Sequence, residues 1–220
     1  DISAFLDEFL KKFNYINGRG YMCMPTGNHD MIRYSRRRSE EELKLVAAFI
    51  MLMPTIPFVY YGDEIGMKYA EGLHSKEGGF FRTGSRTPMQ WEKGKNMGFS
   101  ATDGELYLPV DTTKNAPSVR EQEMRKDSLL NTVRAFTELR AGEPDLQAGG
   151  DFDVVYGKKG EYPFVFRRGR FMVAANPRAA AAECTIPVGN YRVRLAIGNA
   201  EIKEDKLSVD KLSLVVFEKE

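Results

Sequence analysis

A histidine and an aspartate stand side by side just after a short apolar run near the start of the chain. The run covers residues 21–24 and is followed closely by Asn28, His29 and Asp30. A neighbouring imidazole and carboxylate can hydrogen-bond adjacent hydroxyl groups of a sugar ring, or one of them can orient the other. Asn-His-Asp is also favourable turn chemistry, because such side chains hydrogen-bond their own backbone. Both interpretations of the tripeptide remain open on spacing alone.

The elements around this tripeptide predict a parallel α/β arrangement. Helix and strand patterns alternate, with helices expected at 2–16 and 40–53 and strands buried on both faces at 21–24 and 56–61. Ser39 and Glu42 form a capping box for the second helix. Side chains at the carboxyl ends of strands line the active sites of parallel α/β folds, which is where His29 and Asp30 fall.

The second half of the chain changes its periodicity. A stretch from about 62 to 127 has little pattern, as is usual for long functional loops, and a further helix capped by Asp127 is expected up to Gly142. From Glu143 onward apolar residues alternate between glycine-containing turns, which predicts an antiparallel β domain, most simply a sandwich. The sequence therefore predicts two domains, residues 1–142 and 143–220.

The composition excludes several classes of protein. The 220 residues contain 32 Lys and Arg and 31 Asp and Glu, so no excess of positive charge indicates a nucleic-acid or membrane-surface partner. The longest apolar run, residues 45–53, is too short to cross a bilayer. Cys23 and Cys184 make no disulfide framework, and both are expected to be small buried side chains. No targeting segment is visible, no pattern points to a cofactor or a metal, and the compartment stays open.

The predicted barrel-like part is incomplete as a sheet. Two parallel strands with three helices leave open edges, which a stable sheet does not tolerate. We therefore expect either that the chain pairs with another chain through these edges or that about six strands are missing upstream.

Several short blocks, in the same order, resemble the α-amylase family, glycoside hydrolase family 13. They are residues 28–33 (Asn-His-Asp-Met-Ile-Arg), 57–67, 86–91 (Arg-Thr-Pro-Met-Gln-Trp), 96–100, 106–110 and 127–140. The block at 86–91 is similar to that of the α-glucosidase, oligo-1,6-glucosidase and trehalose-synthase members. In front of it, residues 82–85 (Arg-Thr-Gly-Ser) replace the family's usual lead. The resemblance covers essentially the whole chain.

The resemblance implies a (β/α)8 barrel followed by a β-sandwich. Family members hydrolyse or transfer α-glucosidic bonds with retention, using a nucleophile and an acid/base after the fourth and fifth barrel strands. The strand that leads to Asp30 looks like the seventh and residues 56–61 like the eighth. Residues 1–142 are then the C-terminal portion of the barrel, and the chain carries neither the nucleophile nor the general acid.

The resemblance assigns roles to three residues of this chain. Asp30 matches the third family carboxylate, which stabilises the oxocarbenium-like transition state, and His29 matches a histidine that binds the same sugar. Arg86 matches an arginine that holds the non-reducing glucosyl unit.

Other polar residues have simpler interpretations. Asp63 and Glu64 are expected to be scaffold residues at a strand end, and Arg33 to anchor a loop or an internal carboxylate. His74 has no partner spacing for a metal and is expected at the surface. Trp91 and Tyr107 either stack on a sugar or anchor their loops.

The leading hypothesis is hydrolysis of α-glucans or short α-glucosides. Transglycosylation or isomerisation, as in a trehalose synthase, is the alternative within the same class. A non-catalytic relative that serves as a binding or partner subunit is the alternative from another class. The expected partners are the sugar substrate and the missing N-terminal part of the barrel.

Overall fold

The computed structural model describes residues 2–16, 18–76 and 82–220. By its contacts the chain forms two compact units: residues 1–24, 44–56 and 136–220 make up the first, and residues 25–43 and 57–135 the second. This division differs from the predicted domain boundary at residue 143, which stays a prediction. No helix within the described residues is long and apolar enough to span a membrane.

The first helix, α1, runs from Ser3 to Ile16 and confirms the predicted helix. Leu6 and Phe9 are its buried residues, so the apolar face is used as the spacing predicted. Phe9 packs edge-on against Phe152, with 5.5 Å between the ring centroids. Aromatic rings at this distance and orientation bind one another favourably, and they fix α1 within the first unit.

Two short strands follow the predicted positions, but they are not buried. β1 (Cys23–Pro25) and β2 (Ile56–Phe58) form a two-stranded sheet, with hydrogen bonds from Ile56 N to the Met22 carbonyl (2.8 Å) and from Thr26 N to the Phe58 carbonyl (2.9 Å). From one bond to the next the residue numbers increase in both strands, so the two strands run parallel. The expectation of strands buried on both faces was wrong, since the outer residues of each are exposed. Two strands cannot cover their own faces, and Cys23, expected to be buried, is exposed for the same reason.

Two longer helices begin with side-chain caps. α2 runs from Glu40 to Leu52, and its predicted capping box is confirmed: Ser39 N donates to Glu42 Oε2 (2.7 Å) and Glu42 N to Ser39 Oγ (3.3 Å). α4 runs from Leu129 to Gly142. Its cap is Ser128, whose Oγ accepts from Asn131 N at 3.2 Å, so the expectation of Asp127 was wrong by one position.

Between β2 and α4 the chain is irregular, as predicted. It contains the 3₁₀ turns η1 (Asp63–Ile65), η2 (Thr83–Ser85) and η3 (Lys95–Gly98) and one short helix, α3 (Val119–Glu123). A small apolar cluster brings together Ile65 of η1, Met67, Met89 and Leu130 of α4, with Val119 of α3 packed against it. Parts of the irregular stretch are therefore packed against α4 through apolar side chains.

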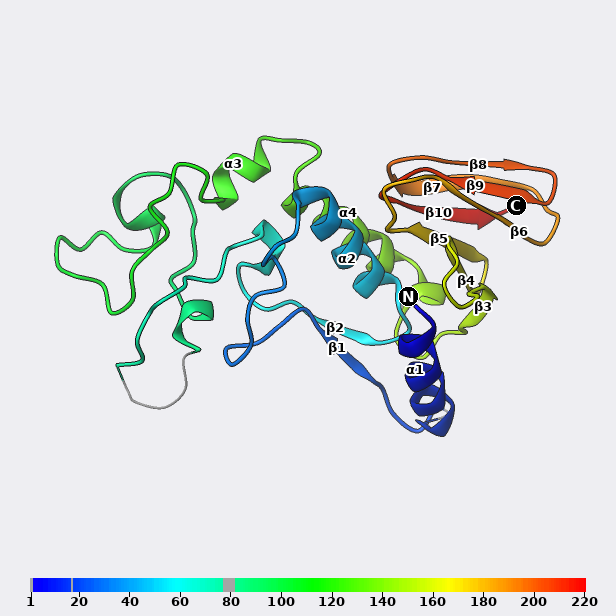
Figure 1. Cartoon of the computed structure of the whole chain (residues 1–220), viewed down its shortest axis with the longest axis horizontal. Helices are drawn as coiled ribbons and strands as arrows, with labels where there is room; N and C mark the ends of the chain where they lie inside the picture. Colours follow the sequence, from blue (N-terminus) through cyan, green and yellow to red (C-terminus); the bar gives the residue numbers. More distant parts are fainter. Residues whose placement is uncertain (1, 17, 77–81) are drawn as a thin grey trace. The chain divides into compact units, whose positions relative to one another are not determined.

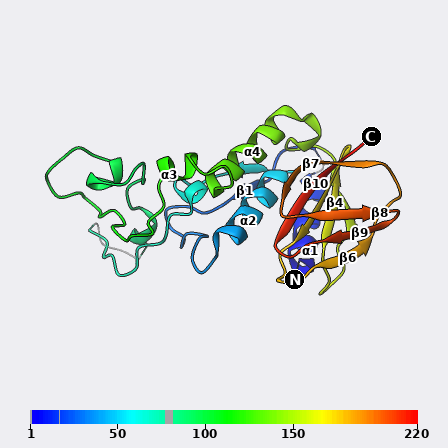
Figure 2. The same ribbon diagram turned by 90° about the horizontal axis from the view of Figure 1, so that it is seen from above.

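The C-terminal strands form the predicted antiparallel sandwich (Figures 1 and 2). The larger sheet has the order β3-β4-β5-β10-β7 and the smaller one the order β6-β9-β8. The strands are β3 (Asp153–Tyr156), β4 (Phe164–Arg168), β5 (Phe171–Asn176), β6 (Ala182–Thr185), β7 (Tyr191–Ile197), β8 (Ala200–Lys203), β9 (Lys206–Val209) and β10 (Ser213–Lys219). Val165, Met172 and Val215 of the larger sheet pack with Leu207 and Val209 of the smaller one, so the core lies between the two sheets.

Two buried arginines bind the end of α2 within the first unit, one from α4 and one from the sandwich. Arg140 of α4 donates to the carbonyls of Met53 (3.0 Å) and Thr55 (2.6 Å), directly after α2. Arg168 of β4 donates to the Leu52 carbonyl at the end of α2 (2.5 Å), and burial lowers its pKa to about 10. The C-terminal end of α2 favours cations, because the last carbonyls of a helix lack backbone partners and carry partial negative charge.

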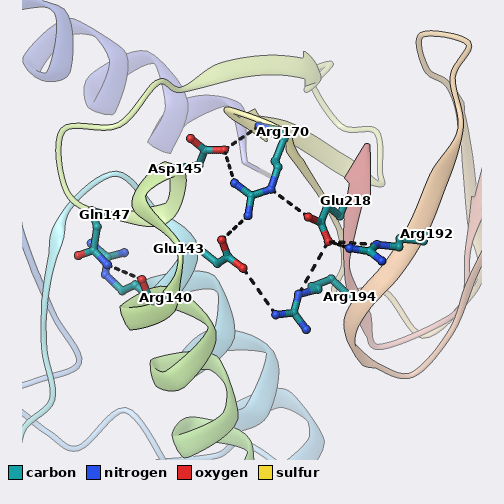
Figure 3. Close-up of polar contacts among 8 residues, drawn as sticks. All are labelled: Arg140, Glu143, Asp145, Gln147, Arg170, Arg192, Arg194 and Glu218. Carbon is teal, nitrogen blue, oxygen red and sulfur yellow. Dashed lines mark hydrogen bonds and ion pairs between the residues drawn. The ribbon is translucent and has the colours of Figure 1, made fainter. Parts of the chain in front are cut away.

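A charged network closes the junction between α4 and the larger sheet (Figure 3). Arg170 contacts Glu143, Asp145 (3.3 Å) and Glu218 (2.9 Å). Arg192 lies 2.8 Å from Glu218, while Arg194 lies 3.5 Å from Glu143 and 3.9 Å from Glu218. We call these six residues the arginine network. It links the end of α4 and the turn η4 (Pro144–Leu146) to β7 and β10.

Candidate active site

The segment after β1 carries the His-Asp pair on a tight turn. Asp30 N donates to Asn28 Oδ1 at 2.8 Å, so the Asn28 side chain closes the turn in the way that the sequence chemistry allows. Both carboxylate and imidazole nevertheless remain accessible, with 42% of the Asp30 and 64% of the His29 side chain exposed. The turn thus presents the pair to solvent, and the two interpretations of the tripeptide are compatible.

The structure brings the three predicted site residues together. Arg86 Nη2 lies 2.8 Å from Asp30 Oδ1, and Arg86 Nε donates to the His29 carbonyl at 3.0 Å. His29 Nε2 is 3.4 Å from the same Asp30 oxygen. Their roles toward a substrate stay predictions, but their proximity is a property of the fold.

Arg82 is a fourth member that sequence reasoning missed. Its Nη1 lies 3.0 Å from Asp30 Oδ1, beside the Arg86 contact. Arg82 stands in the segment that departs from the family pattern, and its position four residues before Arg86 was the one available signal. Two guanidinium groups therefore meet one carboxylate oxygen, and they fix its orientation.

Below the turn lies a fully buried ion pair. Arg33 Nη1 and Asp63 Oδ1 are 3.0 Å apart, and neither side chain is exposed. Asp63 Oδ2 accepts from Thr26 Oγ1 at 2.6 Å, and Arg33 Nη2 donates to the Ser85 carbonyl at 3.0 Å. Burial raises the pKa of Asp63, while the bonds from Thr26 and Arg33 act in the opposite direction. The expectation that Asp63 is scaffold and that Arg33 anchors an internal carboxylate is confirmed.

This buried pair positions the exposed site. Thr26 precedes the His-Asp turn, whereas Ser85 immediately precedes Arg86. Ser85 Oγ also donates to the His29 carbonyl at 3.1 Å. Arg33 and Asp63 thus tie the end of β1, the end of β2 and the Arg86 loop to one point. Charge-assisted hydrogen bonds of this kind hold loops in one geometry, which a site on loops requires.

Tyr60 and Tyr61 cover the Arg33 guanidinium. Each ring centroid is 5.1 Å from the Arg33 Cζ atom, within cation–π range. The hydroxyl of Tyr60 donates to the Ser85 carbonyl (3.2 Å) and that of Tyr61 to the Thr87 carbonyl (2.7 Å). Burial raises the pKa of Tyr60 to about 12. Both tyrosine hydroxyls therefore donate hydrogen bonds to the Arg86 loop.

Arg86 also lines a pocket of about 500 Å³. We call it the aromatic pocket, because Tyr61, Trp91, Phe99 and Tyr107 line it. Trp91 and Phe99 are each 50% exposed and Tyr107 is 58% exposed. The prediction left open whether Trp91 and Tyr107 meet a sugar or anchor loops, and the structure places both rings in one cavity.

Glu64 is also part of the aromatic pocket. Its Oε2 atom is buried and has no hydrogen-bond partner among the described residues. Burial raises the pKa of Glu64, while bonds from backbone N–H groups act against it. Glu64 was expected to be scaffold like Asp63, and adjacent residues in a turn cannot be distinguished by sequence spacing. The structure separates them, because both carboxylate oxygens of Asp63 are paired, whereas Glu64 lines the pocket and its buried Oε2 has no partner among the described residues.

Two further polar side chains lie at the surface. His74 is exposed, as predicted, and Arg36 is an exposed residue that pairs with Glu71 at 3.0 Å. Across the described ranges, no group of three or more His, Cys, Asp or Glu side chains is arranged to hold a metal ion.

A match to a family model identifies the family to which the chain belongs. The model for the α-amylase catalytic domain matches residues 1–149. This chain belongs to the α-amylase family. The resemblance seen in the sequence blocks is therefore confirmed.

Individual relatives lie in the α-glucosidase branch of the α-amylase family. A probable oligo-1,6-glucosidase 2 of Bacillus subtilis is 30% identical over 70% of this chain and 33% of that protein. The salivary α-glucosidase of Aedes aegypti is 30% identical over 60% of this chain and 26% of that protein. The trehalose synthase/amylase TreS of Mycobacterium tuberculosis is 35% identical over 49% of this chain and 18% of that protein. The chain spans about a third or less of these relatives.

Solved structures of the α-amylase family type share the fold. A MutB mutant in complex with sucrose superposes over 97% of this chain and 46% of that chain, with a TM-score of 0.80 and 18% identity. An isomaltulose synthase mutant from Erwinia rhapontici superposes over the same shares with a TM-score of 0.76 and 20% identity. The architecture is thus the last two strands and flanking helices of a (β/α)8 barrel followed by an antiparallel β-sandwich, as predicted.

Proposed function

We propose that the chain is the C-terminal part of a retaining hydrolase that cleaves α-glucosidic bonds in short α-glucosides or α-glucans. Membership of the α-amylase family and the names of the relatives support this reaction class. The observation that carries the proposal is the meeting of Arg86 with Asp30 and His29 across 56 positions of sequence. A carboxylate, an imidazole and a guanidinium on one exposed surface are the groups that bind the hydroxyls of a glucosyl ring.

Asp30 is the transition-state carboxylate in this proposal. Its contacts with described residues all use Oδ1, so Oδ2 is the oxygen left to accept from a sugar hydroxyl. Such a hydrogen bond strengthens as positive charge develops at the anomeric carbon, and it therefore stabilises the transition state more than the bound substrate. Arg82 and Arg86 hold the carboxylate in place before the substrate arrives, which removes a cost of reorganisation.

His29 and Arg86 position the glucosyl unit. The exposed imidazole adjoins Asp30 and can donate to a neighbouring hydroxyl of the same ring. Arg86 is bound to both the Asp30 carboxylate and the His29 backbone, so one side chain sets the spacing of the pair. We propose that the nucleophile and the general acid, about 5–5.5 Å apart in retaining enzymes, come from sequence outside these 220 residues.

The two-stranded sheet of β1 and β2 has open edges to which the remaining barrel strands could pair. Ile56 and Phe58 at the ends of β2 are 36% and 54% exposed, in a sheet of two strands. We propose that six further barrel strands pair with these edges in the working enzyme. Without them, the edges favour association of the chain with copies of itself.

Turnover of nitrophenyl α-glucoside tests the proposal. The 220-residue chain alone should release no nitrophenol, whereas the gene product that includes the remaining barrel strands should release it. In that gene product Asp30→Asn should lower kcat by at least about 100-fold, the scale of one lost transition-state contact. Near-normal kinetics of this variant would remove Asp30 from the site.

Product analysis separates the alternatives. Free glucose as the main product supports hydrolysis, while a new disaccharide from maltose indicates transfer or isomerisation, as the name of the TreS relatives suggests. A gene product that binds glucosides without turning them over indicates a non-catalytic partner subunit.

A further inference from the structure

Arg86 is a partly exposed side chain of the candidate site, and its two neighbours along the chain, Ser85 and Thr87, are buried. Arg86 directly follows the turn η2, and its backbone N–H donates to the Thr83 carbonyl at 2.9 Å. Pro88 follows Thr87, and a proline disfavours helical backbone angles in the residue before it. The place of the guanidinium therefore depends on how firmly the two buried neighbours are held.

The carbonyl of Ser85 is held by two donors. Arg33 Nη2 donates to it at 3.0 Å and the Tyr60 hydroxyl at 3.2 Å. Ser85 Oγ adds a bond of 3.1 Å to the His29 carbonyl. Loss of any one of these hydrogen bonds leaves the other two, so the N-terminal side of Arg86 is fixed redundantly.

The carbonyl of Thr87 depends on one side chain. The Tyr61 hydroxyl donates to it at 2.7 Å, and no other donor contacts it among the described residues. Leaving the carbonyl of a buried residue without a donor is unfavourable, so the backbone shifts until the oxygen finds another partner. The C-terminal side of Arg86 therefore has a single fixed point, which Tyr61 supplies.

We propose that Tyr61 is a positioning residue for Arg86: its hydroxyl, through the Thr87 carbonyl, holds the guanidinium on Asp30. The inference rests on the proposed function, because it assigns Tyr61 to the same site and the same reaction. The Tyr61 hydroxyl donates to the backbone and not to the Asp30 carboxylate. Tyr61 is therefore not a catalytic residue, and it acts through Arg86.

Small shifts of the Arg86 backbone matter because both contacts of its guanidinium are directional. Nη2 lies 2.8 Å from Asp30 Oδ1, and Nε lies 3.0 Å from the His29 carbonyl. Hydrogen bonds weaken steeply as their angle departs from linearity, and displacement of a site group by about 1 Å costs up to about 100-fold in rate. Arg82 contacts Asp30 alone of the three site residues, so it does not replace Arg86 in setting the spacing of the pair.

Tyr60 and Tyr61 form a matched pair for a test. Each ring centroid lies 5.1 Å from the Arg33 Cζ atom, and each hydroxyl donates to a carbonyl next to Arg86. Tyr60→Phe removes a hydrogen bond that Arg33 duplicates, whereas Tyr61→Phe removes the donor to Thr87. Both substitutions keep the aromatic ring, so neither removes the cation–π contact.

The first measurement is the steady-state cleavage of nitrophenyl α-glucoside by the gene product that includes the remaining barrel strands. Tyr61→Phe should lower kcat/KM about fivefold, the scale of one hydrogen bond between a hydroxyl and a carbonyl. Tyr60→Phe should lower it by less than about twofold, since Arg33 remains. Tyr191→Phe removes a 3.2 Å bond to the Pro187 carbonyl in the sandwich and should leave it unchanged. Wild-type kcat/KM of Tyr61→Phe, or an equal loss in Tyr60→Phe, would overturn the proposal.

A double-mutant cycle shows whether Tyr61 acts through Arg86. In the Arg86→Lys background, Tyr61→Phe should have little further effect on kcat/KM, because the forked guanidinium that Tyr61 positions is gone. A purely structural role of Tyr61 would give additive losses. Additive losses would therefore overturn the proposal.

The second measurement needs no turnover and uses the 220-residue chain. The Nε–H proton of Arg86, bonded to the His29 carbonyl, should exchange slowly with water and give an NMR signal that is absent from Arg86→Lys. Tyr61→Phe should accelerate this exchange about fivefold, and Tyr60→Phe should accelerate it less. Unchanged exchange in Tyr61→Phe would overturn the inference and leave the hydrolase proposal intact. Faster exchange in Tyr61→Phe, together with a gene product that proves inactive, would contradict the hydrolase proposal and support the positioning of Arg86 by Tyr61.

Discussion

Arg86 donates a 2.8 Å hydrogen bond to Asp30 across 56 positions of sequence, and its Nε atom also holds the carbonyl of His29. The irregular stretch after β2 is therefore not a spacer. It returns to the carboxyl end of β1 and contributes Arg86 to the candidate site. Arg86 makes two directed contacts at once, which a planar guanidinium allows and a single ammonium does not.

Arg86→Lys should lower kcat/KM for short α-glucosides by at least about tenfold in the gene product with the complete barrel, because Lys keeps the charge but loses the forked geometry. Arg86→Ala should lose more. Arg82→Ala should have a smaller effect, since Arg82 contacts Asp30 alone of the three site residues. Steady-state kinetics on maltose and on a long α-glucan provide the comparison. Equal losses on both substrates would contradict a role in holding the non-reducing end.

The buried pair under the site gives a prediction for stability. Asp63→Asn leaves the Arg33 guanidinium buried without its counter-ion, and removing one member of such a pair costs about 3–5 kcal/mol. The exposed pair of Arg36 and Glu71, with side chains 41% and 64% exposed, is the matched control. Arg36→Ala should change the free energy of unfolding by less than about 0.5 kcal/mol. Urea unfolding followed by circular dichroism measures both. A small effect of Asp63→Asn would show that Arg33 finds other partners.

The arginine network predicts sensitivity to acid. Hydrogen bonds from Arg170 and Arg192 lower the pKa of Glu218 below its ordinary value of 4.5. A carboxyl group with a lowered pKa in the folded state stabilises the fold above the unfolded value and loses that contribution as the pH falls through the folded value. Glu218→Gln should therefore be less stable than wild type at pH 7, and the difference should shrink below pH 4.5. Unfolding curves from pH 7 to pH 3 test this, and a constant difference over that range would exclude the linkage.

Local patterns predicted a large part of this fold. The helix α1, the Ser39–Glu42 box and the strands β5 and β7 were predicted from the pattern of nearby residues, and they appear where expected, although β5 is buried at nearly every position. The exposure of β1 and β2 could not be read in this way. Apolar side chains predict a buried strand, but burial depends on how many neighbouring strands and helices cover it, and β1 and β2 pair only with each other among the described residues.

The candidate site was predictable in its members but not in its arrangement. His29, Asp30 and Arg86 stand in recognisable blocks, whereas Arg82 and Glu64 depend on the direction of side chains in irregular turns. Asp63 and Glu64 are neighbours with the same chemistry. A contact with Arg33, thirty positions away from Asp63, decides which of the two is paired, and no local pattern contains that information.

The open sheet yields a prediction for the state of the chain in solution. Phe58 is 54% exposed at the end of β2, and unpaired strand edges with apolar side chains favour pairing with another chain. The 220-residue chain should therefore show a mass that rises with concentration in analytical ultracentrifugation. Phe58→Asp should shift the chain toward the monomer, because a charge at the edge opposes strand pairing. Val188→Asp places the same charge at a residue that is 76% exposed outside the strands, and it should leave the association unchanged. A wild-type chain that stays monomeric at high concentration would show that the edges of β1 and β2 do not attract a partner.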